Sequence, residues 1–99
     1  MEPNKRFMNS ITEGNLWIYV LSLGKESEIQ EREVPRLVFE RFGFLPSQIM
    51  LKTVLFRLKG EKYISKEKLA GESAYRATEK GLRELESMRS YCSNLLQKL

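Results

Sequence analysis

The stretch from Leu45 to Gly81 constrains the fold of this chain more than any other part of the sequence. It begins with Pro46 and Ser47, which suit a helix entry because proline fixes a helical φ and serine can accept a hydrogen bond from a free amide of the first turn. Two short segments of alternating polar and apolar residues follow, at 62–65 and 73–77. Alternation of this kind predicts the two strands of a hairpin. The stretch therefore predicts a helix followed by a small β-hairpin.

Two further helices are predicted before this stretch. Residues 10–13 (Ser-Ile-Thr-Glu) form a capping-box pattern, behind which apolar residues recur at helical spacing up to Gly24. A second helix is predicted over residues 35–42, with proline in its first turn and Gly43 at its end. Only two residues separate Gly43 from Pro46. So short a connection places the second and third helices side by side at an angle, which is a helix-turn-helix arrangement.

A last helix begins at Thr78, a good N-cap residue, and runs to the end of the chain. The expected fold is therefore mostly α with a small β-wing (α+β), a winged helix-turn-helix with a long C-terminal helix. A chain of 99 residues makes one domain. Within it we expect residues 10–78 to form the three helices and the wing, and residues 79–99 to form a dimerisation helix.

The net charge of +4 is unevenly distributed along the chain. Residues 1–45 carry six basic and seven acidic residues, residues 46–78 carry seven and three, and residues 79–99 carry four and three. The basic excess therefore lies in the third helix and the hairpin. A basic surface on an otherwise balanced chain is typical of a site that binds a polyanion such as nucleic acid.

The residue types exclude several classes of protein. The sequence has one cysteine, Cys92, and no histidine, so it has no internal disulfide and no zinc site of the cysteine–histidine type. Histidine is also the usual base beside a serine or cysteine nucleophile, so we expect neither an enzyme nor a cofactor. No apolar run approaches the roughly 20 residues that span a bilayer. The first 14 residues lack the apolar core of a secretion signal. We therefore expect no membrane span and a cytoplasmic location.

The predicted third helix has two different sides. An apolar stripe is formed by Leu51, Val54, Leu55 and Leu58. The opposite side is polar and basic, and in a major groove its glutamine can pair with adenine and its lysine with guanine or a phosphate. The hairpin adds basic residues suited to phosphates. The predicted DNA-binding residues are Ser47, Gln48, Met50, Lys52, Thr53, Lys59, Lys66, Lys68 and Arg76. The alternative is that they are merely solvent-facing residues of a small helix and hairpin.

The last helix carries a pattern that predicts a dimer. Apolar residues separated by 3, 4, 3 and 4 positions are Leu85, Met88, Cys92, Leu95 and Leu99. This spacing is that of a coiled-coil seam, and a helix roughly 30 Å long is too long for the body of a small domain to cover. A second apolar edge is formed by Leu82 and Leu96, and we expect Trp17 of the first helix to join the interface. A two-fold homodimer is therefore predicted, with Cys92 as a packing residue.

Taken together, these segments resemble the PadR-like transcriptional regulators. The resemblance lies in SITEGNLWIYVLSLG (10–24), in TVLFRLKGEKYI (53–64), which is similar to a reading helix running into a wing strand, and in YRATEKG (75–81), which is similar to the family pattern Y-x-I-T-E-x-G. The C-terminal helix corresponds in place to the family's dimer-forming helix. Some relatives hold flat ligands with a tryptophan of that helix, whereas the single tryptophan here belongs to the first helix, so no particular effector is predicted.

The resemblance and the residues together imply a homodimeric, sequence-specific DNA-binding transcriptional regulator, most simply a repressor. Its third helix would enter the major groove and its wing would follow the phosphate backbone of double-stranded promoter DNA. The alternative is a winged-helix module that binds another protein. An apolar patch of Phe56 and Leu69 would suit that alternative better than it suits phosphates.

Overall fold

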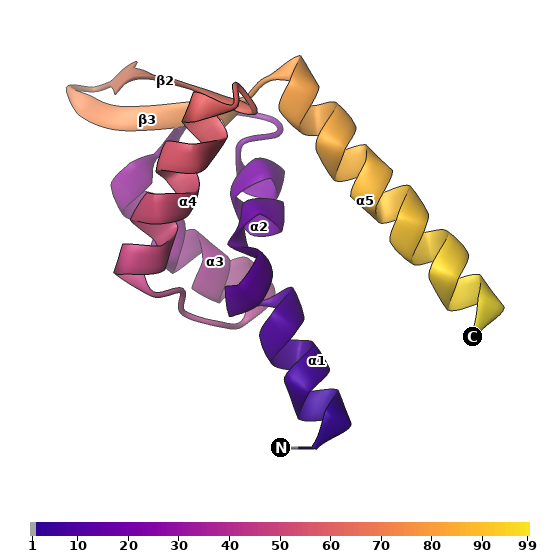
Figure 1. Ribbon diagram of the computed structural model, residues 1–99. Coiled ribbons are helices and arrows are strands. Elements are labelled where there is room, and N and C mark those ends of the chain that lie inside the picture. The colour runs from indigo at the N-terminus through magenta and orange to yellow at the C-terminus, as the bar shows by residue number, and fades with distance from the viewer. Residues whose placement is uncertain (1) are drawn as a thin grey trace.

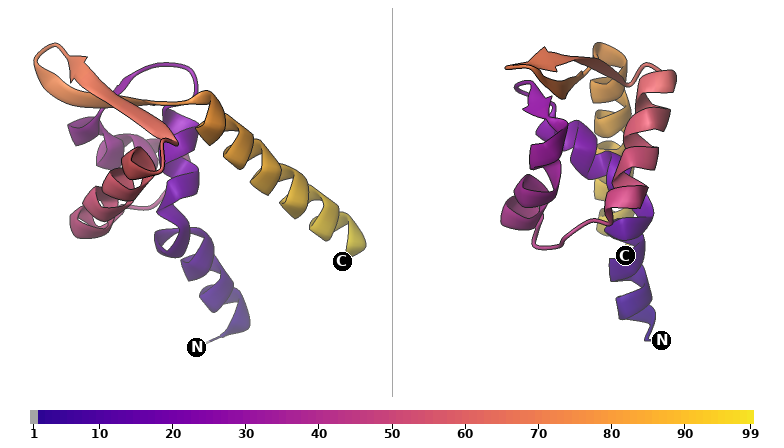
Figure 2. Two further views of the ribbon diagram at one scale, coloured as in Figure 1. Left: turned by 45° about the horizontal axis from the view of Figure 1, so that its top comes forward. Right: turned by 90° about the vertical axis from the view of Figure 1, so that its left-hand side faces the viewer.

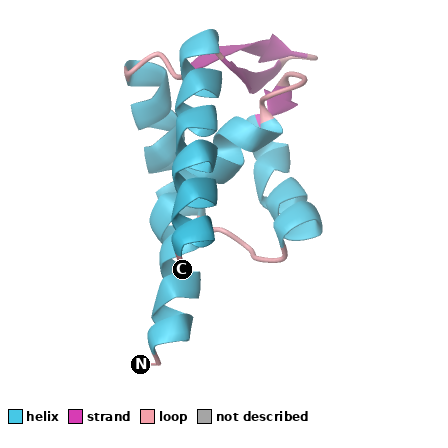
Figure 3. Ribbon diagram, turned by 90° about the vertical axis from the view of Figure 1, so that its right-hand side faces the viewer, coloured by secondary structure: helices cyan, strands magenta, loops and turns pink. Residues whose placement is uncertain are grey.

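The computed structural model describes residues 2–99 and places a small sheet at one end of a helical body (Figures 1 and 3). Both chain termini lie at the other end. The elements are, in chain order, α1 (Pro3–Ile11), η1 (Glu13–Asn15), α2 (Leu16–Leu23), β1 (Ile29–Gln30), η2 (Glu31–Glu33), α3 (Val34–Phe42), α4 (Gln48–Gly60), β2 (Ile64–Leu69), β3 (Glu72–Ala77) and α5 (Glu79–Lys98), where η marks a short 3₁₀ helix. The expected winged helix-turn-helix with a long C-terminal helix is confirmed.

The hairpin of β2 and β3 is longer than the alternating residues predicted. Lys66 and Lys68, expected in the connection between the strands, lie within β2. Only Ala70 and Gly71 form the turn, and both have positive φ, 53° and 80°. This combination is the type I′ turn, whose twist matches that of the two strands it joins. The basic residues of the wing are therefore held on regular strands rather than on a loop.

A third strand, β1, was not predicted. Ile29 pairs with Tyr75 and Gln30 pairs with Ala74, so β3 lies in the middle of an antiparallel sheet of order β1-β3-β2. The side-chain amide of Gln30 also donates a hydrogen bond to the carbonyl of Leu69, at 2.9 Å. Two residues are too few to show alternation. The extended conformation of this segment therefore comes from its pairing with β3.

The core lies where the sheet meets α2, α3 and α4, and Tyr75 is at its centre. The tyrosine ring is fully buried, and its hydroxyl donates a hydrogen bond to the carbonyl of Val20, at 2.7 Å. Burial, and secondarily the charge of Glu31, raise the pKa of Tyr75 above the ordinary value of 10.0. Apolar side chains from four helices and β2 complete this cluster, among them Leu21, Val38, Leu55 and Ile64.

Three of the predicted helix ends are confirmed by their hydrogen bonds. Gly43 follows α3 with φ of 83°, a left-handed C-cap. The hydroxyl of Ser47 accepts a hydrogen bond from the amide of Met50 at 3.4 Å, and that of Thr78 accepts one from the amide of Gly81 at 3.1 Å. These caps fix where α4 and α5 begin relative to the wing.

The capping box predicted at residues 10–13 is wrong, because these residues end a helix instead of starting one. Ser10 lies inside α1, and the hydroxyl of Thr12 donates hydrogen bonds to the carbonyls of Met8 and Asn9, at 2.9 and 3.2 Å. A threonine can bond backward to a helix that it follows as readily as forward to one that it precedes. The predicted first helix therefore begins only at Leu16, after the short turn η1.

The whole molecule measures 46 × 27 × 22 Å. Two helices, α1 and α5, extend beyond its body (Figure 2). α1 has no buried residue, and neither does α5 beyond Leu85. α1 and α5 are seen apart from each other in Figure 1 and in the left view of Figure 2. No helix within residues 2–99 combines the length and the apolar character that crossing a membrane requires.

Candidate nucleic-acid interface

The helix α4 has the two sides that its sequence predicts. Leu51, Leu55 and Leu58 are buried against the body, and Val54 is half-buried. The predicted DNA-binding residues of α4 are all exposed, but they do not lie together. Gln48 and Lys52 line a groove of about 360 Å³ between α4 and β3, whereas Met50 and Thr53 line a larger cavity, of about 500 Å³, on the other side. Lys59 follows Lys52 by seven residues and therefore lies on the groove side.

The cavity on the far side of α4 is formed with α2 and α5. It brings Met50 and Thr53 close to Trp17, whose ring nitrogen donates a hydrogen bond to the side chain of Asn15 at 3.2 Å. Trp17 is half-buried and packs against the core of its own chain. Only the exposed part of the Trp17 ring is therefore accessible to the dimer interface that the sequence predicts.

The charges of α4 are free of partners within the described chain. The helix carries Lys52, Arg57 and Lys59 and no acidic residue, and none of the three forms an ion pair within residues 2–99. Such unpaired cations attract an anion without first having to leave a partner.

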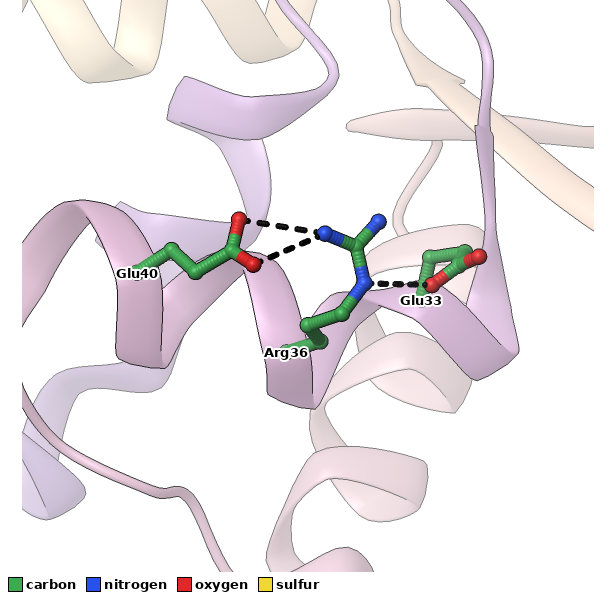
Figure 4. Close-up of polar contacts among 3 residues, drawn as sticks. All are labelled: Glu33, Arg36 and Glu40. Atoms are coloured by element: carbon green, nitrogen blue, oxygen red, sulfur yellow. Dashed lines mark hydrogen bonds and ion pairs between the residues drawn. The ribbon is translucent and has the colours of Figure 1, made fainter.

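The neighbouring helix α3 differs in this respect (Figure 4). Arg36 is held at 3.0 Å by Glu33 and again by Glu40, and these hydrogen bonds raise the pKa of its guanidinium. One guanidinium thus faces two carboxylates, and this cluster presents no excess of positive charge to solvent. The unpaired positive charge of the helix-turn-helix is concentrated on α4.

The wing does not bring its three predicted phosphate ligands together. Residues that pair directly in an antiparallel sheet lie on the same face. Lys66 pairs with Tyr75 and Lys68 with Ser73, so both lysines share the face of Tyr75, whereas Arg76 lies on the opposite face. The side chain of Lys66 is also mostly buried and forms an ion pair with Glu31 at 3.4 Å. Lys68 and Arg76 are exposed, and neither forms an ion pair within the described residues.

The seam predicted on α5 divides into two parts. Leu85 is buried in the core of its own chain, and Leu82 and Met88 are half-buried. The later residues, Leu95, Leu96 and Leu99, are exposed together with Cys92, whose thiol lies 3.7 Å from the sulfur of Met88. The first part of the seam therefore packs within the chain, and the second part remains uncovered.

An apolar surface on α1 was not predicted from the sequence. Phe7, Met8 and Ile11 are exposed on this helix. Pro3 in its first turn and the helical spacing of these three residues are the signals that could have revealed it. The hydroxyl of Tyr19 donates a hydrogen bond to the carbonyl of Ile11, which ties the end of α1 to α2. Burial raises the pKa of Tyr19.

No protein-family model matches the chain, and no curated protein matches it by sequence. Several solved structures match it by fold. A PadR family transcriptional regulator from Eggerthella lenta DSM 2243 has a TM-score of 0.80 at 20% identity, covering 95% of this chain and 86% of the other. F93 from STIV, a winged-helix DNA-binding protein, has a TM-score of 0.73 at 19% identity, covering 85% and 92%.

A third match is PadR of Bacillus subtilis in complex with operator DNA, with a TM-score of 0.65 at 21% identity, covering 74% of this chain and 45% of the other. These structures are thus of a transcriptional regulator, of a DNA-binding protein and of a protein bound to operator DNA. At these identities the likeness concerns the fold. The chain thus has the winged-helix fold of the PadR-family transcriptional regulators.

Proposed function

We propose that this protein is a homodimeric, sequence-specific DNA-binding regulator of the PadR type, most simply a repressor that occupies a promoter in the cytoplasm. The observation that carries the proposal is the outer side of α4. The exposed surface of α4 has three cations, which form no ion pair within residues 2–99, and no carboxylate, and it stands beside a two-stranded wing. A helix in the major groove with a wing on the backbone uses these two elements together. The structural neighbour bound to operator DNA supports the same use of the fold.

Each element has its own role in this proposal. Gln48 and Lys52, on the groove side of α4, read base edges, and Ser47, Met50 and Thr53, at the N-terminal cap and in the first half of the helix, assist them. Phosphates are bound by Lys59 and by the wing residues Lys68 and Arg76. Lys66 contributes less because Glu31 already neutralises it. This division gives sequence discrimination to α4 and general affinity to the wing.

The homodimer is proposed to form through the uncovered apolar residues of α1 and α5. Apolar side chains on a projecting helix are covered in a stable protein by another surface, and a second copy offers an identical one. The seam from Met88 to Leu99, with Leu96 beside it, would then pair with its two-fold equivalent. Two α4 helices related by this axis would enter successive major grooves about 34 Å apart, so the DNA site would be pseudo-palindromic.

The test is a fluorescence-anisotropy titration of duplex DNA from the promoter of the protein's own gene against a scrambled duplex, at two salt concentrations. We expect tighter binding to the promoter, one dimer per site, and an affinity that falls steeply with salt because counterions are released from the phosphates. Lys52→Ala with Lys59→Ala is expected to weaken binding to both duplexes, because two cations are lost, and to reduce the preference for the promoter, because Lys52 reads base edges. Lys98→Ala, at the last residue of α5, serves as the control for the loss of a positive charge. Absence of binding to either duplex at low salt would contradict the proposal.

A second candidate function is docking of a partner protein by α4 and the wing. It is favoured by the exposure of Phe56, at 76%, and of Leu69, at 39%. Binding of a partner protein through apolar contacts depends little on salt, whereas DNA binding weakens steeply as salt is added. The salt dependence of binding therefore separates the two functions.

A further inference from the structure

The outermost line of α4 is apolar, although the sequence predicted a polar outer side. A helix turns by about 100° per residue, so the residues most distant from the buried Leu51, Leu55 and Leu58 are Ile49, Thr53 and Phe56. We call these three the crest of α4. Ile49 is 79% exposed and Phe56 is 76% exposed, so neither side chain is covered by its own chain. Large apolar residues are rarely so exposed unless something contacts them.

Thr53 adds hydrocarbon rather than a hydrogen-bond donor to the crest. Its hydroxyl donates to the carbonyl of Ile49, one turn earlier in α4, at 3.0 Å. A threonine hydroxyl has a single proton, so no donor remains for a ligand. The crest therefore presents alkyl and aromatic groups from Ile49 to Phe56, over about 10 Å of helix length.

Cations stand on both sides of this apolar line. Lys52 and Lys59 lie on the side of the groove beside β3, and Arg57 lies on the side of the cavity beside α2. This order, positive, apolar, positive, matches the cross-section of a major groove, where the two phosphate backbones form the walls and the base edges form the floor. A protein partner offers no such reason for two cationic flanks and for the absence of a carboxylate on α4.

We propose that the crest of α4 reads thymine through its C5-methyl group, and that Ile49 is the specificity-determining residue. The methyl group is the one apolar feature in the major-groove pattern of the bases. Ile49 is the second residue of α4 and so belongs to the end of the helix that lies nearest the bases. The inference rests on the proposed function, and it assigns to an apolar contact part of the base recognition that is expected of Gln48 and Lys52.

The test removes the methyl group alone. A binding site is first selected by the full-length protein from a randomised duplex library, and each thymine of the site is then replaced by deoxyuridine, which keeps every hydrogen-bonding group. We expect deoxyuridine at one position of each half-site to weaken binding about fourfold, the effect of burying one methyl group. Ile49→Ala is expected to bind thymine and deoxyuridine equally at that position. Leu45→Ala, which shortens another exposed apolar side chain outside α4, is expected to keep the discrimination.

Each other result overturns the inference in a recognisable way. If the unmodified protein binds every deoxyuridine duplex as tightly as the thymine duplex, the methyl group is not read, although the proposed function stands. If Ile49→Ala still discriminates, another residue reads the methyl group. If no duplex is selected at low salt, the proposed function fails and this inference fails with it.

Discussion

Gly81, in the first turn of α5, stands where no other residue fits. A Cβ atom at this position would lie 2.2 Å from the carbonyl oxygen of Tyr63 and 3.0 Å from a methyl group of Leu21. A backbone carbonyl cannot turn aside as a side chain can, so α5 would have to move away from the body. The glycine that ends the YRATEKG segment is therefore required by the close approach of α5 to the residue that precedes β2.

Gly81→Ala is expected to lower the free energy of unfolding by about 1–3 kcal/mol, the usual cost of overpacking. Gly60→Ala is the matched control, since Gly60 also lies in a helix but has nothing within 4 Å of its added Cβ. There alanine favours the helix, and we expect a gain of up to about 1 kcal/mol. Urea unfolding of both variants measures the difference. Equal effects would show that α5 tolerates a shift at this contact.

Tyr75 should make stability depend on pH in alkaline solution. Its pKa is raised by burial in the folded protein, so the folded state favours the neutral phenol. Below the unfolded pKa of 10.0 both states are neutral and the contribution is complete; above it the unfolded phenol ionises while the folded one does not, and stability falls. Tyr75→Phe removes this pH-dependent loss of stability. It also removes the hydrogen bond to Val20, which lowers the free energy of unfolding by about 1 kcal/mol. Urea unfolding from pH 8 to 11 should therefore show a steeper decline for the unmodified protein than for the variant.

At the scale of elements, α4 and the wing are expected to affect DNA binding differently. Lys68→Ala removes an exposed phosphate ligand and should weaken binding to all duplexes about equally. The slope of log affinity against log salt concentration should also be smaller by about one. Gln48→Ala should instead change the preference among duplexes that differ by single base pairs. Binding to such a panel at two salt concentrations measures both. If both variants weaken every duplex in the same proportion, the division of roles between the two elements is wrong.

The elements that the sequence could predict are those with a local signal. The stripe of α4, the caps at Ser47 and Thr78 and the C-cap at Gly43 each depend on a few adjacent residues, and all are confirmed. β1 could not be predicted, because two residues become a strand only through pairing with β3. The capping box failed because Thr12 bonds backward to α1.

For the candidate site, the exposed side of α4 was predictable from its periodicity, but the arrangement of residues on it was not. The separation of Gln48 from Met50 and the ion pair between Lys66 and Glu31 depend on how the wing, η2 and α2 pack around α4. The exposure of Ile49 depends on the same packing. The polar and basic character of this surface could thus be predicted from the residue types, whereas which residues lie together on it depends on the packing of the fold.

At the scale of the whole molecule, the uncovered part of α5 leads to a prediction about association. Leu95→Lys places a charge on the seam and is expected to shift a dimer toward monomer in analytical ultracentrifugation, because an unpaired charge in an apolar interface is costly. Asn94→Lys adds the same charge on the opposite side of α5 and should leave the dimer intact. The melting temperature of the unmodified protein should also rise with its concentration. A monomer at all accessible concentrations would contradict this prediction.

The central position of β3 has a consequence for how the chain is made. The hydrogen bond from Tyr75 to Val20 spans 55 residues, and that from Gln30 to Leu69 spans 39. Contacts so distant in sequence form only after a large loop has closed, which slows folding. During synthesis the helices before β3 emerge first, with their shared core still open at the place that Tyr75 will fill. The nascent chain therefore cannot complete this core before β3 has been synthesised, and until then the apolar surfaces that Tyr75 will cover stay open.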